Sequence, residues 1–208
     1  MRASSSPASV VLFDLGGVLV RVRGFTNLAA LLSRLGVEWA GDGQEIRERW
    51  LRSTAVRSFE LGQVPPGVFA QRFVEEWHLP IEPAAFAEDV AGWIVGPFPG
   101  AQRLIADLQH LRCHVSCFSN CNALHWEQMT SFLGLLDSAY SSHILGLIKP
   151  DEEAFAAVAE RLGVDPGDIV FFDDSRSNVE AAGRVGMRSF LVDGPDACRA
   201  VLESEGLL

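Results

Sequence analysis

The feature that most constrains the fold is an apolar run near the start of the chain that ends in an aspartate. Residues Val10–Phe13 are all apolar, Asp14 follows them, and glycines come at Gly16 and Gly17. Such a run, bounded by glycine, is typical of a strand buried on both faces of a parallel sheet. Open α/β sheets bind ligands at the carboxyl ends of their strands. The position of Asp14 fits a ligand site, and it fits equally a turn-forming residue at a strand end.

Short apolar runs and helical patterns alternate after residue 99. Further strands are expected at about 114–118, 139–142, 168–172 and 188–192. Helical patterns occupy residues around 104–111, 124–133, 151–162, 175–185 and 196–205. Alternation of this kind with short connections predicts a three-layer α/β domain with a parallel sheet and right-handed crossovers.

Residues 21–98 have a different pattern. Four helical stretches run to about residue 95, no strand-like alternation occurs among them, and residues 96–100 indicate a linker. Four of the five tryptophans lie here, at Trp39, Trp50, Trp77 and Trp93. They indicate either a contact surface or, as we favour, the filling of a small helical core. The predicted organisation is a core domain of residues 1–20 and 99–208, interrupted by a helical insert of residues 21–98.

The charge and hydropathy patterns argue against nucleic acids and membranes as partners. The net charge is −10 over 208 residues and the Lys and Arg residues are scattered, so the basic stripe of a nucleic-acid groove is missing. No long apolar run or polybasic amphipathic helix indicates a membrane role. The first nine residues are small and polar, and we expect a mobile lead-in there and no signal peptide. No pattern indicates an oligomeric state.

The four cysteines lack the spacing of a metal site or a disulfide framework. Cys113, Cys117, Cys121 and Cys198 form no C-x-x-C pair, which favours reduced thiols in a cytoplasm. Cys121 and His125, four residues apart, are conceivable as nucleophile and base. No third residue that would orient them is apparent, so a bystander thiol is the favoured interpretation.

Four predicted strand ends or loops carry polar residues. They are Asp14, the pair Ser119-Asn120, Lys149 before Pro150, and the pair Asp173-Asp174. Taken singly, each has a structural explanation, because such residues commonly cap helices, form turns or lie on the surface.

Together and in this order, these residues resemble the four motifs of the haloacid dehalogenase-like hydrolase superfamily. The nearest resemblance is to the branch of small bacterial phosphatases that read F-D-L-G-[GN]-V, as residues 13–18 do here. That family has a Rossmann-like α/β core with a helical cap inserted after the first motif, which is the place of residues 21–98. The resemblance implies a hydrolase that forms a covalent aspartyl phosphate.

The resemblance also implies the role of each residue. Asp14 would be the nucleophile that attacks phosphorus. Mg²⁺ would be held by Asp14, the backbone carbonyl of Gly16 and Asp174, with Asp173 nearby, and would offset the repulsion between two anions. Lys149 would add a fixed positive charge. Ser119 and the amide of Asn120 would donate hydrogen bonds to the transferring group.

Two positions depart from the family pattern. Phosphatases of this family usually carry a second aspartate two residues after the nucleophile, as general acid and base, and here that position is Gly16. Glu60 and His125 are the candidates for a substitute proton donor, although a structural role is favoured for both. Asn178 stands where relatives often have a second acidic residue. Arg21 and Arg23 are either contacts for a substrate anion or, as we favour, solvated charges.

The predicted function is Mg²⁺-dependent hydrolysis of a small phosphorylated metabolite, with sugar phosphates among the candidates. One alternative is a metal-free 2-haloacid dehalogenase, in which Asp14 attacks carbon. Another is a catalytically weak protein that binds a ligand or a protein, which the loss of the second aspartate at Gly16 supports.

Overall fold

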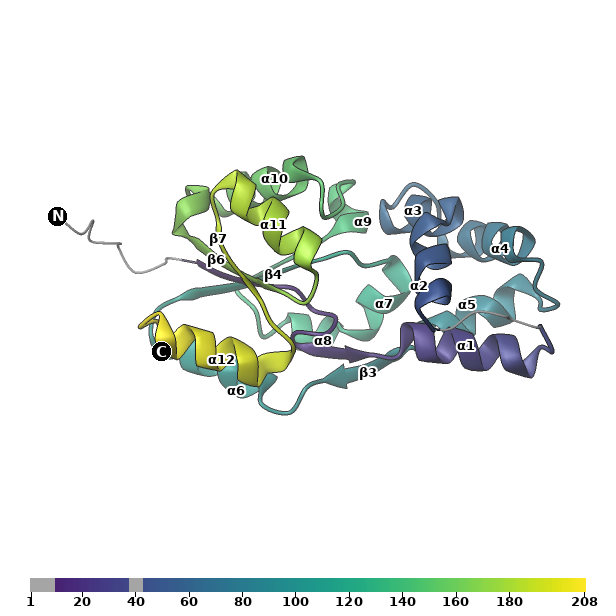
Figure 1. The fold of residues 1–208 in the computed structure, drawn as a ribbon, viewed down its shortest axis with the longest axis horizontal. Coiled ribbons are helices and arrows are strands. Elements are labelled where there is room, and N and C mark those ends of the chain that lie inside the picture. Colours follow the sequence, from purple (N-terminus) through teal and green to yellow (C-terminus); the bar gives the residue numbers. More distant parts are fainter. Residues whose placement is uncertain (1–9, 38–42) are drawn as a thin grey trace.

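A five-stranded parallel sheet forms the centre of the computed structural model, which describes residues 10–37 and 43–208 (Figure 1). The predictions for residues 1–9 and for Trp39 lie outside the described residues. Across the sheet the strand order is β5 (Ser138–Ser141), β4 (His114–Ser119), β1 (Val10–Phe13), β6 (Ile169–Asp173) and β7 (Arg188–Leu191). The predicted fold class is confirmed, and the apolar run at Val10–Phe13 is the central strand.

The register of the sheet aligns the ends of its three central strands. Phe13 is paired with Cys117 of β4 and with Phe172 of β6. The residues that follow, among them Asp14 and Asp173, therefore emerge side by side at the carboxyl edge. This is the edge at which parallel sheets place their ligands.

Helices cover both faces of the sheet because β1 is apolar on both sides. Val10 and Leu12 pack with α10 (Glu152–Leu162) and α11 (Arg176–Val185) on one face. Val11 and Phe13 pack with α6 (Ala101–His110) and α12 (Gly194–Ser204) on the other (Figure 1). A short 3₁₀ helix, Pro166–Asp168, precedes β6.

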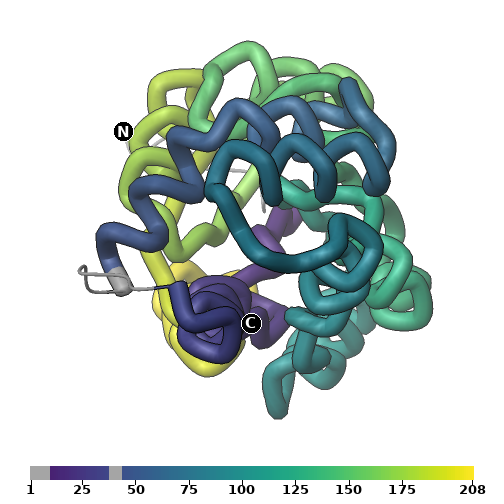
Figure 2. Tube along the Cα trace, turned by 90° about the vertical axis from the view of Figure 1, so that its right-hand side faces the viewer, coloured from purple at the N-terminus to yellow at the C-terminus, as the bar shows by residue number. Residues whose placement is uncertain are grey.

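The helical insert has its own apolar cluster. Its helices are α1 (Gly24–Arg34), α2 (Gly43–Arg52), α3 (Thr54–Glu60), α4 (Pro66–Trp77) and α5 (Pro83–Ala91). Figure 2 views the molecule from the side of the insert. Trp50, Trp77 and Trp93 are 6%, 3% and 2% exposed within this cluster, so the prediction that they fill a core is confirmed. None of the described helices combines the length and apolar composition needed to cross a membrane.

The connections to the insert were predicted wrongly. Residues 20–22 and 94–97 form an antiparallel ribbon of β2 (Val20–Val22) and β3 (Ile94–Pro97). The sequence predicted no strand in the insert, and it assigned residues 94–97 to the end of a helix and the start of a linker. The fourth helix ends at Ala91, before Trp93 and Ile94. Strands this short are stabilised by pairing between residues distant in sequence, which apolar periodicity does not report.

Two predicted helical stretches are each divided in two. The second predicted stretch of the insert, marked by Ile46, Trp50 and Phe59, breaks at Ser53. The Ser53 hydroxyl accepts a hydrogen bond from the Val56 amide at 3.2 Å and begins a new helix. In the core, residues 123–133 form α7 (Ala123–Gln128) and α8 (Thr130–Leu133). The unpredicted turn α9 (Ser142–Leu145) follows β5.

Candidate active site

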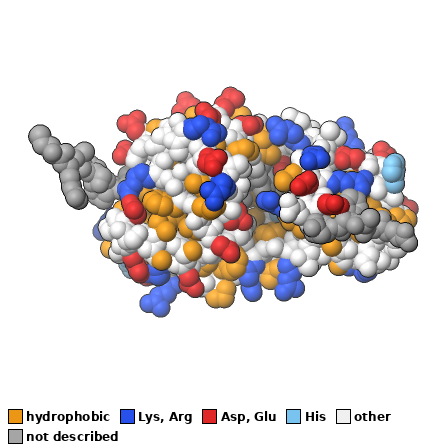
Figure 3. All heavy atoms as spheres, viewed as in Figure 1, with side chains coloured by type: hydrophobic (Ala, Val, Ile, Leu, Met, Phe, Trp, Pro, Cys, Tyr) orange, Lys and Arg blue, Asp and Glu red, His pale blue; other side chains and the backbone are white. Residues whose placement is uncertain are grey.

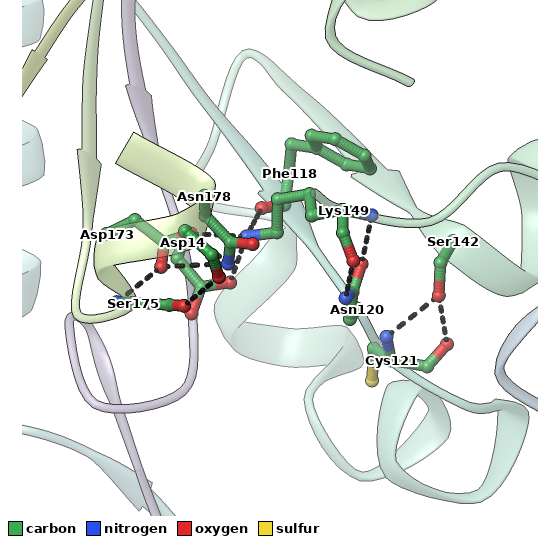
Figure 4. Close-up of polar contacts among 10 residues, drawn as sticks. Asp14, Phe118, Asn120, Cys121, Ser142, Lys149, Asp173, Ser175 and Asn178 are labelled. Carbon is green, nitrogen blue, oxygen red and sulfur yellow. Dashed lines mark hydrogen bonds and ion pairs between the residues drawn. The ribbon is translucent and has the colours of Figure 1, made fainter. Parts of the chain in front are cut away.

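Side chains from four separate segments meet at the carboxyl edge of the sheet (Figure 4). Asp14 follows β1, Ser119 ends β4, Asp173 ends β6, and Lys149 lies in the loop between α9 and α10. All four are buried, with exposed fractions from 0% for Asp173 to 8% for Asp14. The structure thus brings the predicted residues to one place.

Lys149 connects two of the aspartates. Its Nζ donates to Asp14 Oδ1 at 2.9 Å, to Asp173 Oδ2 at 2.6 Å and to the Phe118 carbonyl at 2.9 Å. Burial alone would lower the pKa of Lys149, but the two carboxylates outweigh it and raise the pKa. Of the 17 Lys and Arg residues in the sequence, Lys149 is the only lysine. It is a permanent, fixed cation.

Neighbouring amides hold this arrangement in place. The Asn120 side chain donates to the Lys149 carbonyl at 2.8 Å and accepts from the Lys149 amide at 2.9 Å, so it fixes the loop that carries the lysine. Asp173 accepts from the Ser175 amide at 2.8 Å and from the Asn178 side chain at 3.0 and 3.1 Å. Asn178 therefore acts on Asp173, and through it on the lysine.

Three carboxylates form a cluster suited to a divalent cation. Oxygens of Asp14, Asp173 and Asp174 lie within 4.8 Å of one another. Burial raises the pKa of Asp14, and burial with the charges of Asp14 and Asp173 raises that of Asp174 to about 6. One lysine cannot neutralise three carboxylates, and hard oxygen donors are what Mg²⁺ prefers. The donor set therefore fits this ion.

The backbone after Asp14 is pressed against this cluster. Gly17 has a φ of +75°, and a β-carbon there would lie 2.3 Å from Asp174 Oδ2. Only glycine combines that conformation with such a close approach. Gly16 is different, because its β-carbon would meet only Val22 Cγ2 at 3.7 Å, an ordinary contact.

A cavity of about 340 Å³ opens above these residues, between the core and the insert. Its core side includes Asp14, Ser119 and Lys149, and its insert side includes Phe25, Trp50, Glu60 and Trp93. The space-filling view shows the surface hollowed between the two parts of the molecule (Figure 3). Arg23 lines the cavity, whereas Arg21 is absent from its lining among the described residues.

Cys121 and His125 do not form a catalytic pair. The His125 ring contacts the Val90 carbonyl through Nε2 at 2.9 Å and the Asn122 side chain through Nδ1 at 3.3 Å. Burial raises the pKa of the Cys121 thiol well above its usual range, so the thiol stays protonated and unreactive. The interpretation of Cys121 as a bystander agrees with this geometry.

Sequence reasoning missed the parts of the site that depend on tertiary contacts. It did not identify the Phe118 carbonyl as an acceptor for Lys149, nor the aromatic wall of Phe25, Trp50 and Trp93. It placed the amide of Asn120 on the substrate, which stays a prediction, and did not identify the role of the Asn120 side chain in holding the loop of Lys149. No local sequence signal distinguishes these roles.

The chain matches a family model and resembles several known proteins. The model, described as hydrolase, haloacid dehalogenase-like hydrolase, matches residues 8–186. Phosphatase MT3486 of Mycobacterium tuberculosis (strain CDC 1551 / Oshkosh) is 44% identical over 73 residues, 35% of this chain and 30% of that protein. The bifunctional riboflavin kinase/FMN phosphatase of Arabidopsis thaliana is 28% identical over 89% of this chain and 48% of its own length. The chain spans less than half the length of these relatives.

Solved structures share the fold. The haloacid dehalogenase (HAD) family enzyme BT-2542 of Bacteroides thetaiotaomicron has a TM-score of 0.78 at 22% identity, covering 94% of this chain and 99% of that one. The same enzyme in complex with magnesium and inorganic phosphate has a TM-score of 0.71 at 23% identity, covering 88% and 93%. At these identities the likeness establishes a common architecture of parallel sheet and helical insert.

Proposed function

The chain belongs to the haloacid dehalogenase-like hydrolase family, and on that premise we propose that it is a Mg²⁺-dependent phosphatase that acts on a small phosphorylated metabolite. The observation that carries the proposal is the buried Lys149, bonded to both Asp14 and Asp173 at the edge of a cavity. It places a fixed cation beside a candidate nucleophile, where an incoming dianion needs one. Relatives named as phosphatases, and a structural neighbour with bound magnesium and phosphate, support the same reaction.

In the proposed reaction, Asp14 attacks phosphorus and forms an aspartyl phosphate, which water then hydrolyses. Lys149 holds the Asp14 carboxylate in orientation and faces the phosphoryl oxygens with its charge. The Ser119 hydroxyl and the main-chain amide of Asn120 donate to the transferring group. The Asn120 side chain acts indirectly, by positioning the loop of Lys149.

Asp14, the Gly16 carbonyl and Asp174 are the proposed ligands of Mg²⁺, with Asp173 beside them. Both oxygens of Asp173 already accept hydrogen bonds, from Lys149, Ser175 and Asn178, so we assign it mainly to orienting the lysine. When bound, the ion supplies positive charge that lowers the repulsion between carboxylate and phosphate.

We propose that the body of the substrate lies in the cavity between a core of residues 1–20 and 99–208 and an insert of residues 21–98. The insert side of the cavity combines aromatic rings with few polar groups, which suits an apolar substrate body. The activity test therefore compares sugar phosphates with more apolar phosphate esters. The free thiols of the chain agree with a reducing compartment, and we propose the cytoplasm.

The test is hydrolysis of p-nitrophenyl phosphate and of a panel of sugar, nucleotide and amino-acid phosphates, with Mg²⁺ and with a chelator. We expect turnover that requires Mg²⁺ and is abolished in Asp14→Asn. The exposed Asp165→Asn is the matched control and should retain wild-type rates. Undiminished turnover in Asp14→Asn would show that the mechanism is wrong.

The two other functions are decided in the same experiment. A 2-haloacid dehalogenase would bind a carboxylate substrate beside three carboxylates, which repel it, and its signature is halide release from 2-chloropropionate without metal. A protein that only binds its ligand, as the absence of a carboxyl at Gly16 suggests, would bind phosphate esters without turnover on any member of the panel.

A further inference from the structure

One glutamate of the insert lines the cavity that contains the candidate nucleophile. Glu60 is the last residue of α3, and it lines the same cavity as Asp14, Ser119 and Lys149. Its neighbours in the cavity wall include the rings of Phe25, Trp50 and Trp93. An acidic side chain among aromatic rings is costly to bury as an ion, so its presence needs an explanation.

Contacts with the core fix the position of Glu60. The Ser142 hydroxyl donates to the main-chain carbonyl of Glu60 at 2.6 Å. The Ser142 hydroxyl oxygen also accepts a hydrogen bond at 3.1 Å from the main-chain amide of Cys121, which lies two residues after Ser119. Two residues beyond Glu60, Gly62 approaches α9 so closely that a β-carbon would lie 2.0 Å from the His143 carbonyl oxygen. The end of α3 is therefore held against α9 and the segment that follows Ser119.

The environment of Glu60 brings its pKa close to neutral pH. Burial raises its pKa to about 7, and a hydrogen bond with Trp50 and the charge of Arg57 oppose this only in part. The titratable or charged side chains on the packed elements and in the cavity wall include Arg49, Glu76, His143, Cys121, Arg23, His125, Asp14 and Lys149. A general acid and base works best when its pKa lies near the working pH.

Given the proposed phosphatase activity, we propose that Glu60 is the general acid and base of the reaction, replacing the carboxyl that Gly16 lacks. In the first step the Asp14–phosphorus bond forms, the bond from phosphorus to the leaving oxygen breaks, and the Glu60 proton passes to that oxygen. In the second step water attacks phosphorus, its proton returns to Glu60, and the bond to Asp14 breaks. The net reaction consumes one water and restores both carboxyl groups.

The other candidates in the cavity fit this role less well. Both ring nitrogens of His125 are engaged by Val90 and Asn122, and burial lowers the pKa of His125, so it has no proton directed into the cavity. Arg23 is exposed, and a guanidinium does not release its proton in this pH range.

The decisive experiment measures how Glu60→Gln depends on the leaving group. Phosphates of 2,4-dinitrophenol, phenol and a simple alcohol are compared at saturating Mg²⁺, with the exposed Glu88→Gln of the insert as the matched control. We expect a loss of about 10²–10⁴-fold on the alkyl ester, because its leaving oxygen needs a proton. The dinitrophenyl ester should change by less than about tenfold, since its anion leaves unaided.

Two further readouts separate a catalytic role from a structural one. In the wild type, kcat should fall as pH rises through about 7, because the general acid loses its proton. This fall should be absent in Glu60→Gln and present in Glu88→Gln. In Glu60→Gln, the second substitution Gly16→Asp should restore hydrolysis of the alkyl ester, because a β-carbon at Gly16 would make only an ordinary contact and the new carboxyl would stand two residues after Asp14.

Thermal unfolding checks that Glu60→Gln is folded. The folded-state pKa is raised, so the stability from protonated Glu60 is present below about pH 4.5 and is lost as pH rises towards about 7. Wild type should therefore lose stability relative to Glu60→Gln across this window.

Equal losses on all three esters, with an unchanged pH profile and no rescue, would overturn the role of Glu60. If the role of Glu60 is overturned in this way, loss of all turnover in Asp14→Asn would still support the proposed phosphatase activity.

Discussion

The substitution Lys149→Met gives the most direct test of how the site is assembled. It removes the charge but keeps an unbranched apolar side chain, so packing changes little. The side chains of Lys149 and Asp173 are 1% and 0% exposed, and that of Asp14 is 11% exposed. The variant therefore leaves two buried carboxylates without their common cation, and the Phe118 carbonyl without its donor.

The expected magnitude follows from this burial. Breaking a buried ion pair by removing one partner costs about 3–5 kcal/mol of unfolding free energy, because the remaining charge stays buried and unpaired. For a chain of this size, each kcal/mol corresponds to roughly 2–4 °C, so the melting temperature should fall by about 6–20 °C. Phosphatase kcat should fall by at least about 10²-fold, the usual cost of one electrostatic donor.

The assay is urea unfolding followed by tryptophan fluorescence, at neutral pH without divalent ions. Arg161→Met, which removes an exposed cation from α10, is the control and should change stability by less than about 0.5 kcal/mol. Adding Asp173→Asn to Lys149→Met should recover part of the loss, because one uncompensated charge disappears. A loss below about 1 kcal/mol in the single variant would refute the view of Lys149 as the cation that holds the carboxylates together.

Three glycines give the remaining predictions. Gly16→Asp should fold normally and raise the rate on alkyl phosphates more than on activated aryl phosphates, whereas equal effects would mean that proton transfer does not limit turnover. Gly17→Ala should lower Mg²⁺ affinity, measured by calorimetry, because its β-carbon would collide with Asp174; unchanged affinity would remove Asp174 from the ligand set. Gly62→Ala should destabilise the contact with His143 and increase amide exchange at the end of α3, and wild-type protection there would contradict the close approach.

The central strands were predictable from the sequence because their physical signature is local. β1 and β6 are buried on both faces, so they are continuous apolar runs that end in aspartates. The order of four polar strand ends and loops then indicated the family, and the family match confirms that resemblance. The roles of the individual site residues stay predictions until they are tested.

Other features could not be predicted because they arise between distant segments. The ribbon of β2 and β3 joins residues more than seventy positions apart, and neither strand has a pattern of its own. The sequence likewise could not decide between a structural and a catalytic role for Glu60, since nothing local indicates its side-chain contact with Trp50 or the hydrogen bond from Ser142 to its main-chain carbonyl. Burial and long-range hydrogen bonds determine the chemistry of such a side chain.

The presence of a single lysine, and its burial, have a practical consequence. Acylating and reductive-alkylation reagents act on uncharged primary amines, and the one ε-amine in these 208 residues is shielded and held protonated between aspartates. The exposed basic side chains, among them arginines and the histidines His78 and His110, carry no primary amine. Incorporation of label at position 149, read by peptide mass spectrometry, would therefore report opening of the site itself, residue-specifically and without any substrate.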